Sequence, residues 1–363
     1  SVEQFARRGD KYMSELLDEL KSGSYTPHPV RRVEIDKGDG KTRPLGIPAV
    51  RDRIVQTALK LTIEPIFEEA FSENSFGYRP EYGCKDALRE VDRLLRNGHH
   101  FVVDADLKSF FATIPHDRLL KEVGKRIADT RILGLSEKFL ARGVMIEQDL
   151  HGSELGTPQG GVISPLLANI YLDPLDQHIA AKGHKMIRYA DDFVILCETR
   201  EEAERALRQV QEWTATAGLT LHPEKTRLVN ARREGFDFLG YRFERNRRRP
   251  REKSLKKIKA TIRAKTPRRS GQSLDDIVKS LNATLAGWYA YYKHSVAKVF
   301  VDLDKMIRRR LRMLLLGRNK KRGRWSGHAN HIWPNVYFEN AGLFCLHRTY
   351  VNEVSLLHRQ RRH

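Results

Sequence analysis

Residues 186–197 read MIRYADDFVILC, and they place two adjacent acids, Asp191 and Asp192, inside an apolar stretch that has the composition of a strand. An ionised carboxylate in an apolar core is costly unless it pairs with a cation or binds a metal. The stretch therefore predicts a cation site in the middle of a strand. A tight turn between two strands is the alternative, because Asp-Asp is also common in turns.

A second stretch, residues 101–107 (FVVDADL), alternates as a strand and carries Asp104 and Asp106 on one face. A site for two divalent ions about 3.5 to 4 Å apart needs oxygen ligands from more than one segment, because a single segment cannot surround both ions. Asp106 and Asp191 can supply such ligands from two strands. This arrangement predicts phosphoryl transfer with two metal ions.

The other elements predicted before residue 244 mix helices with short strands. A turn over residues 36–44 precedes a helix that starts at Arg51, and Pro65 is expected to interrupt that helix. Three further elements follow: a loop that leads into a helix from Pro165, a helix over 201–217 that ends at Gly218, and a third strand pair, 226–230 with 236–243.

Positive charge is the strongest compositional feature of the chain. Its 66 Lys and Arg residues outnumber 46 Asp and Glu residues, which gives a net charge of +20. Residues 245–269 hold thirteen basic residues and one acid. Such a run repels itself unless a polyanion neutralises it, which favours a nucleic-acid partner. The alternative is a solvated surface that only keeps the protein soluble.

Beyond residue 243 the sequence changes from strands to basic helices. The apolar spacing predicts one helix over 273–292 and another over 300–316. We therefore expect three parts: residues 1–243, a helical domain over 244–317, and a basic C-terminal extension over 318–363.

The three cysteines, Cys84, Cys197 and Cys345, are widely spaced. Their spacing predicts neither a disulfide framework nor a cysteine-based metal site, which favours a reducing, cytoplasmic environment. No apolar run approaches the roughly 20 residues of a membrane span, and the N-terminus has no apolar signal core. We expect a soluble intracellular protein with no membrane partner.

The acid-bearing stretches resemble motifs of reverse transcriptases. Residues 189–192 (YADD) are similar to the Tyr-X-Asp-Asp box, with the alanine that is usual in group II intron enzymes. Residues 101–111 (FVVDADLKSFF) resemble the first palm motif, in which the metal-binding aspartate precedes an aromatic by five residues. The resemblance implies that Asp106, Asp191 and Asp192 are the catalytic metal ligands.

Three further stretches match the same family in order and imply nucleotide contacts. Residues 37–48 (KGDGKTRPLGIP) resemble its fingertip motif, residues 156–169 (GTPQGGVISPLLAN) its dNTP-binding loop, and residues 218–225 its palm lysine motif. Phe111 is expected to pack under the sugar and exclude a 2′ hydroxyl, and a core aromatic is the alternative. The implied dNTP contacts are Lys37, Arg43, Phe111, Gln159, Gly160 and Lys225, with Asp104 as a supporting acid.

The last matches imply contacts with nucleic acid. Residues 236–243 resemble the primer grip, and residues 281–292 (LNATLAGWYAYY) are similar to the thumb or maturase domain of group II intron proteins, in which we expect Trp288 to be core. An endonuclease domain of the Cys/His type is not expected. Because the chain starts at Ser1, we expect the N-terminal extension of the family to be missing, whether by truncation or by nature. The expected nucleic-acid-binding residues are Gly240, Tyr241, Arg247, Arg248, Arg249 and Lys256.

The resemblance implies an α+β right-hand polymerase with fingers, an antiparallel palm sheet and a helical thumb. It implies extension of a DNA primer with dNTPs on an RNA template, with an RNA–DNA duplex in the cleft and two Mg²⁺ ions, for which Mn²⁺ can substitute. A bacterial group II intron or intron-like element is the expected source, with intron RNA as a further partner. Two alternatives stay open: an RNA-binding splicing maturase, and a domesticated host polymerase for repair or defence.

Overall fold

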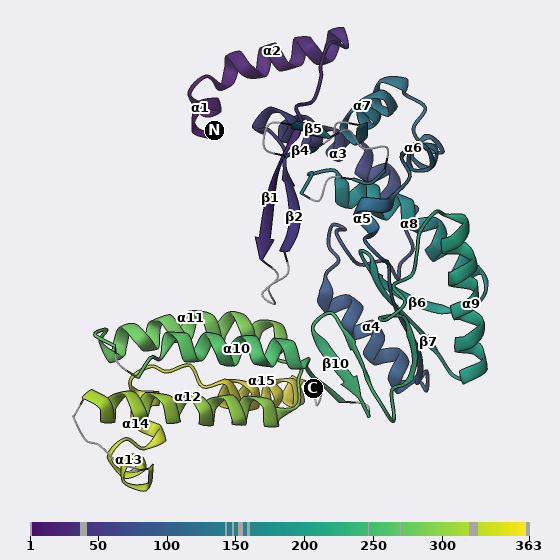
Figure 1. Cartoon of the computed structure of the whole chain (residues 1–363). Helices are drawn as coiled ribbons and strands as arrows, with labels where there is room; N and C mark the ends of the chain where they lie inside the picture. The colour runs from purple at the N-terminus through teal and green to yellow at the C-terminus, as the bar shows by residue number, and fades with distance from the viewer. Residues whose placement is uncertain are drawn as a thin grey trace. The chain divides into compact units, whose positions relative to one another are not determined.

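The computed structural model describes residues 2–36, 42–141, 144–146, 149–151, 155–157, 160–245, 247–268, 270–318 and 326–360. The chain divides into two compact units, Ser1–Asn230 and Ala231–His363, whose helices and strands are drawn in Figure 1. Each unit has its own apolar core. The domain boundary that composition predicts near residue 244 falls within the second unit.

The first unit is built on a four-stranded antiparallel sheet. Its strands, in order across the sheet, are β6 (Lys185–Tyr189), β7 (Asp192–Cys197), β3 (Phe101–Asp106) and β8 (Arg227–Asn230). The strand predicted over residues 101–107 is confirmed, and so is the antiparallel sheet of the expected α+β fold.

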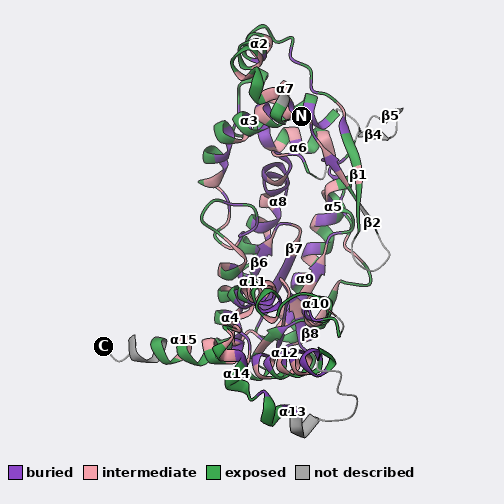
Figure 2. Cartoon of the chain, turned by 90° about the vertical axis from the view of Figure 1, so that its left-hand side faces the viewer, coloured by how far each residue is buried: buried purple, intermediate pink, exposed green. Residues whose placement is uncertain are grey.

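The two faces of this sheet carry different residues. Val103 and Ala105 point into the main core, which includes residues of α8 (Ser164–Ala181) and α9 (Arg200–Thr216). Asp104 and Asp106 alternate with them and so lie on the other face, where α4 (Cys84–Arg96) covers part of β6 and β7. Figure 2 shows β7 and much of α8 as buried. The helices predicted from Pro165 and over 201–217 are confirmed.

Two of the predicted strands are wrong, because each is a hairpin. In the stretch 186–197, β6 ends at Tyr189 and β7 begins at Asp192, so Asp191 lies in the turn and the turn alternative describes the backbone. Residues 236–243 likewise bend into β9 (Phe236–Phe238) and β10 (Tyr241–Glu244), which pair with each other, whereas β8 pairs with β3.

A second sheet of the first unit has the order β2-β1-β4-β5, formed by β1 (Val30–Asp36), β2 (Thr42–Ile47), β4 (Val144–Ile146) and β5 (Asp149–His151). The remaining helices are α1 (Val2–Arg7), α2 (Gly9–Ser22), α3 (Val50–Glu68), α5 (Phe110–Thr113), α6 (His116–Gly124) and α7 (Thr130–Ala141). Helix α3 continues through Pro65, so the predicted interruption is wrong. Pro65 and Leu61 are both exposed, and water can therefore hydrate the carbonyl that the proline leaves unbonded.

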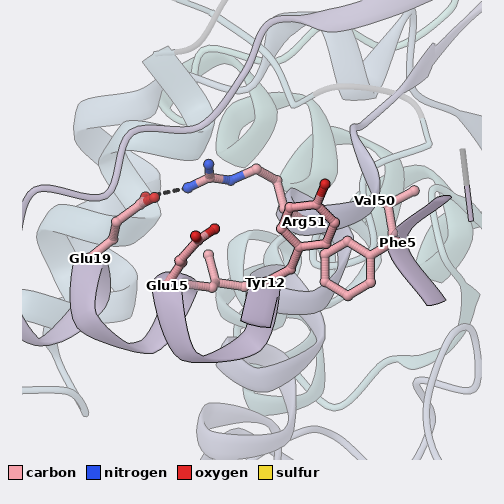
Figure 3. Close-up of a pocket in the computed structure, with 7 residues that line it drawn as sticks. Phe5, Tyr12, Glu15, Glu19, Val50 and Arg51 are labelled. Carbon is pink, nitrogen blue, oxygen red and sulfur yellow. Dashed lines mark hydrogen bonds and ion pairs between the residues drawn. The ribbon is translucent and has the colours of Figure 1, made fainter. Parts of the chain in front are cut away.

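The N-terminal helices contact the start of α3 through an aromatic and ionic cluster (Figure 3). The rings of Phe5 and Tyr12 stack with centroids 5.3 Å apart. Arg51 forms an ion pair with Glu19 and lies over the ring of Tyr25 at 5.3 Å. These contacts attach α2 to the body of the unit. Phe5, Tyr12, Glu19 and Arg51 also line a small hollow of about 330 Å³.

The second unit combines a three-stranded sheet, in the order β11-β10-β9, with six helices among its described residues. Strand β11 (Arg247–Pro250) contradicts the expectation that strands end at residue 243. The helices are α10 (Glu252–Lys265), α11 (Leu274–Tyr292), α12 (Ala297–Arg318), α13 (Ser326–Ile332), α14 (Asn335–Asn340) and α15 (Leu346–Gln360). Both predicted helices are confirmed, as α11 and α12. Trp288 is half-buried against their common core.

Candidate active site

The acids singled out from the sequence meet at one end of the palm-like sheet of the first unit. Asp106 is the last residue of β3 and lies directly opposite Asp192, the first residue of β7. Asp191 occupies the adjoining turn and lines, together with Asp106, a hollow of about 740 Å³. Two segments of the chain thus bring three carboxylates together, as the sequence predicts.

The turn that carries Asp191 is held in a conformation that a non-glycine residue rarely adopts. Ala190 has φ +60°, in the left-handed region. The segment before α4 supports it, because the Arg188 N–H donates to Asn74 O and the Phe76 N–H donates to Arg188 O, each at 2.9 Å. A Cβ at Gly77 would lie 2.2 Å from the nitrogen of Ala190. Only glycine therefore allows this close approach.

Arg188 supports the acidic turn, and it was not singled out from the sequence. Its side chain is fully buried and forms a bidentate ion pair with Asp176 on α8, with Nε 2.8 Å from Oδ1. Its Nη1 donates to Ala190 O and to Asn169 Oδ1, both at 2.9 Å. The guanidinium thus ties the acidic turn to α8. A lone arginine in the apolar stretch MIRY is the signal that could have identified it.

Basic residues of the strand β8 region neutralise the acids on the β3 face. Lys225 forms an ion pair with Asp106, and Arg227 contacts Asp104 at 2.9 Å. The backbone N–H of His222 donates to Asp106 O at 2.8 Å, which fixes the end of β3. Arg227 therefore neutralises Asp104, which does not line the hollow, whereas Lys225 and Asp106 both line it.

The predicted sugar gate and the glycine of the dNTP loop lie in the same hollow. Phe111 is half-buried, packs on the main core and lines the hollow. Gly160 has φ +114°, and a Cβ there would lie 2.5 Å from Gly46 O. The loop can therefore approach β2 only with glycine at this position. Pro44 and Leu45 of β2 complete this wall, and neither was singled out from the sequence.

Part of the predicted nucleotide site is outside the described structure. Lys37 and Gln159 lie outside the described residues, and of Arg43 the structure describes the backbone, which pairs with Ile35 in the β1–β2 hairpin. Their contacts with dNTP stay predictions.

The predicted contacts of the second unit are dispersed over its three-stranded sheet and the helix α10. Tyr241 is buried, and its hydroxyl donates to Tyr291 O at 2.6 Å. Burial raises the pKa of Tyr241 to about 12. Arg248 lies over this ring at 5.9 Å and donates to His294 O at 3.1 Å. Tyr241 therefore belongs to the core, whereas Arg247 and Arg249 on β11 are exposed.

The other predicted contacts in this unit are more exposed or are in the backbone. Gly240 has φ +81° at the β9–β10 turn. Arg247 is exposed. Arg249 pairs with Glu244 at 3.3 Å, and Lys256 pairs with Glu252 at 2.9 Å. Both pairs are largely exposed, so a phosphate group can replace the carboxylate partner at little cost.

The donor set at the acidic hollow suits a hard divalent cation. Carboxylate oxygens from β3 and from the turn before β7 are the ligands that Mg²⁺ prefers, and Mg²⁺ commonly takes one or two carboxylates together with substrate phosphates. The contact of Lys225 with Asp106 shows that this carboxylate already attracts a cation. The residues present therefore fit a divalent metal centre.

Comparisons with known proteins agree with this geometry. The family model "Reverse transcriptase (RNA-dependent DNA polymerase)" matches residues 35–243, and the model "Group II intron, maturase-specific domain" matches residues 255–333. Protein YkfC of Escherichia coli K12 is 37% identical over 273 residues, which cover 64% of this chain and 71% of that protein. The group II intron-encoded protein LtrA of Lactococcus lactis is 39% identical over 171 residues, 47% of this chain but 28% of LtrA.

A solved structure shows the same fold at low identity. Telomerase from Candida albicans superposes with a TM-score of 0.51 and 10% sequence identity, and the match covers 85% of this chain and 65% of that one. This match confirms the polymerase fold that the sequence motifs imply.

In the part of the chain that the structure describes, no helix is long and apolar enough to cross a membrane.

Proposed function

This chain is a reverse transcriptase of the group II intron type, since it belongs to the reverse transcriptase family and carries a maturase-specific domain, and we propose that it extends a DNA primer with dNTPs on an RNA template. The observation that carries the proposal is the placement of Asp106 opposite Asp192, with Asp191 in the same hollow. Asp106, Asp191 and Asp192 would hold two Mg²⁺ ions.

In this proposal the side chains position the reactants and supply charge. When bound, the divalent ions activate the primer hydroxyl and neutralise the triphosphate and the leaving pyrophosphate. Phe111 supports the sugar of the incoming nucleotide and leaves no space for a 2′ hydroxyl. Gly160 lets the dNTP loop approach β2 closely. Lys225, whose ammonium group pairs with Asp106 in the free protein, would contact the triphosphate of a bound nucleotide instead.

Primer extension on an RNA template tests the metal-ligand assignment. Asp191→Asn keeps the size of the side chain and removes its charge, so we expect turnover to fall by about a thousandfold, because a metal centre supplies several kcal/mol of transition-state stabilisation. Affinity for an RNA–DNA duplex should change little. Asp104→Asn is the matched control, since Asp104 pairs with Arg227, and it should retain most of the activity. Wild-type turnover in Asp191→Asn would refute the assignment.

The maturase-specific match over residues 255–333 favours a second function, the binding of a structured intron RNA. The basic surface of the second unit supports it, because phosphate contacts dominate affinity for RNA. If the flanking DNA encodes an intron, Asp191→Asn should still promote its splicing while DNA synthesis is lost. Failure of this variant to bind the intron RNA would limit the protein to polymerase activity.

A further inference from the structure

Three potential metal ligands meet at the end of the palm-like sheet that is remote from the acids. His184 directly precedes β6, Cys197 ends β7, and Glu202 lies in the first turn of α9. One ligand atom from each residue lies within 4.8 Å of the other two. Residues 192–197 separate this cluster from the acidic turn by roughly 17 Å, at about 3.3 Å per residue of strand.

The separations suit a tetrahedral zinc-class ion. Bonds of about 2.0 to 2.3 Å from zinc to nitrogen, oxygen and sulfur place neighbouring ligand atoms roughly 3.3 to 3.7 Å apart. The distance between His184 Nδ1 and Glu202 Oε1 is 3.6 Å. The distances from the Cys197 sulfur to the ligand atoms of His184 and Glu202 are up to 4.8 Å, so they need to shorten by about an ångström when the ion binds.

A buried nitrogen points to a missing ligand in this cluster. His184 is 8% exposed, and its Nδ1 forms no hydrogen bond with any residue that the structure describes. Glu202 Oε1 lies beyond hydrogen-bond distance of it. Leaving a buried nitrogen without a partner is costly. A metal ion between the three side chains would supply that partner.

The three side chains are held by backbone contacts of rigid elements. Cys197 pairs with Phe101 in the sheet. The N–H of His184 donates to Ile179 O at 3.2 Å. Glu202 Oε2 accepts from the Glu198 N–H at 3.0 Å, which leaves Oε1 directed at the histidine. The hydrogen bond to Glu202 is the kind of contact that orients ligand side chains in known metal sites.

We propose that His184, Cys197 and Glu202 bind a zinc-class divalent cation, with water as the fourth ligand. Binding replaces the thiol proton of Cys197, which passes to the buffer, so the bound form carries a thiolate. The expectation that the cysteines form no metal site came from sequence spacing, and it missed this cluster because 13 and 5 residues separate its members along the chain. The ion would join the ends of β6, β7 and α9.

Cobalt(II) substitution tests the proposal on the wild-type chain. We expect one equivalent of Co²⁺, added to metal-free protein, to produce a thiolate-to-cobalt charge-transfer band in the near ultraviolet and visible d–d bands of tetrahedral intensity. Zn²⁺ should abolish both. The Asp106 hollow contains no sulfur ligand among its described lining residues, so cobalt bound there cannot produce the charge-transfer band.

Variants assign the band to its ligands. Cys197→Ser should remove it, and Glu202→Gln, which can still accept from the Glu198 N–H, should weaken Co²⁺ binding by about tenfold or more. Cys345→Ser is the matched control, because its thiol lies in the second unit and bonds to Asp304, and it should leave the band unchanged. Absence of a thiolate band in the wild type, or its persistence in Cys197→Ser, would overturn the proposal.

Discussion

At the residue scale, Arg188 connects the core helix α8 to the turn that carries Asp191. Its guanidinium is fully buried between Asp176 and the carbonyl of Ala190. We expect Arg188→Met to cost about 3 to 5 kcal/mol of stability, because it leaves a buried carboxylate without its partner. Arg188→Lys keeps the charge but loses the bidentate geometry. It should lower turnover in primer extension more than it weakens duplex binding.

Denaturant unfolding of a second variant separates charge from packing at this position. The double variant Arg188→Met with Asp176→Asn removes both members of the pair, and we expect it to be more stable than Arg188→Met alone. If the double variant were less stable than the single one, the cost would come from lost packing and hydrogen bonds to Asn169 and Ala190.

Asp173, one turn before Asp176 on α8, gives a pH-dependent contribution to stability. Burial, and then the neighbouring Asp176 carboxylate, raise the pKa of Asp173. The folded protein therefore binds this proton more tightly than the unfolded chain. The resulting stability is fully present below the ordinary aspartate pKa of about 3.9 and is lost as pH rises through the raised value.

Asp173→Asn does not titrate, and the Asn side chain can still accept the N–H of Ser72 that Asp173 Oδ1 accepts at 3.2 Å. We expect its unfolding free energy, relative to wild type, to increase from acid pH to pH 7. Asp18→Asn, at an exposed position of α2, is the control and should show a smaller change. Urea unfolding at several pH values measures both, and a constant difference for Asp173→Asn would contradict the assignment.

The sequence identifies the acids of the candidate site but not their supports. Asp106 and Asp191 are conspicuous because a carboxylate is unusual among apolar neighbours. Gly77 and Asp176 are not conspicuous, since each matters only through a contact with the turn or with Arg188, and those contacts form when distant segments of the chain meet. A single sequence does not record such pairs.

At the scale of elements, the sequence predicts helices better than it predicts bends in strands. Helices α9, α11 and α12 follow the 3.6-residue spacing of their apolar residues. The sequence predicts continuous strands where the structure has hairpins at Ala190 and Leu239. Both residues take positive φ without being glycine. Neither residue is a usual turn former, and the local signals for a bend come from their neighbours, Asp191 with Asp192 and Gly240.

Helix α15 is attached to α12 by one buried carboxylate. Asp304 accepts the backbone N–H groups of Leu346 and His347, at 3.1 and 3.0 Å, at the start of α15. These donors have no partner within their own helix. We expect Asp304→Ala to destabilise the second unit by about 1 to 3 kcal/mol, because the two N–H groups lose their acceptor.

Hydrogen exchange of α15 amides measures this effect directly, with protection lost first at the start of the helix. Asp302→Ala is the matched control, since Asp302 lies on the same helix and is exposed, and it should leave the protection unchanged. Equal protection in the Asp304→Ala variant and the wild type would show that apolar packing alone holds α15.

At the scale of the whole molecule, the excess of basic residues should make affinity depend on salt. Each phosphate that is neutralised adds about 0.7 to 0.9 to the slope of log affinity against log salt. Neutralising Arg247, Arg248, Arg249 and Lys256 together should flatten this slope by up to about three units if all four contact phosphate. Arg248 already bonds to His294 O, so its share is expected to be the smallest.

Titration with a short RNA–DNA duplex across a salt series measures the slope. A control variant neutralises four exposed arginines of α4 and α9, namely Arg89, Arg96, Arg205 and Arg208. It has the same net charge as the quadruple variant of the second unit. If the two variants lose slope equally, the basic residues act through net charge, and residues 245–269 form no duplex site.

The division of the chain into units after Asn230 differs from the boundary that composition predicts near residue 244. Residues 231–243 group with the second unit, where Tyr241 packs against Tyr291 and Tyr292. Near the C-terminus, Trp333, Phe338 and Leu346 are buried in the same core as α11 and α12. Their apolar partners on α11 and α12 lie in other segments of the chain, so local charge and hydropathy do not reveal the grouping.

The hairpin of β6 and β7 has a consequence for the nascent chain. The segment FVILC of β7 is uncharged, rich in β-forming residues and fully buried when folded, which is the composition of an aggregation-prone strand. Asp191 and Asp192 directly precede it, as gatekeeper charges do in natural sequences. If these acids hold metal in the folded enzyme as proposed, the same charges would also oppose self-association of β7 before its sheet has formed.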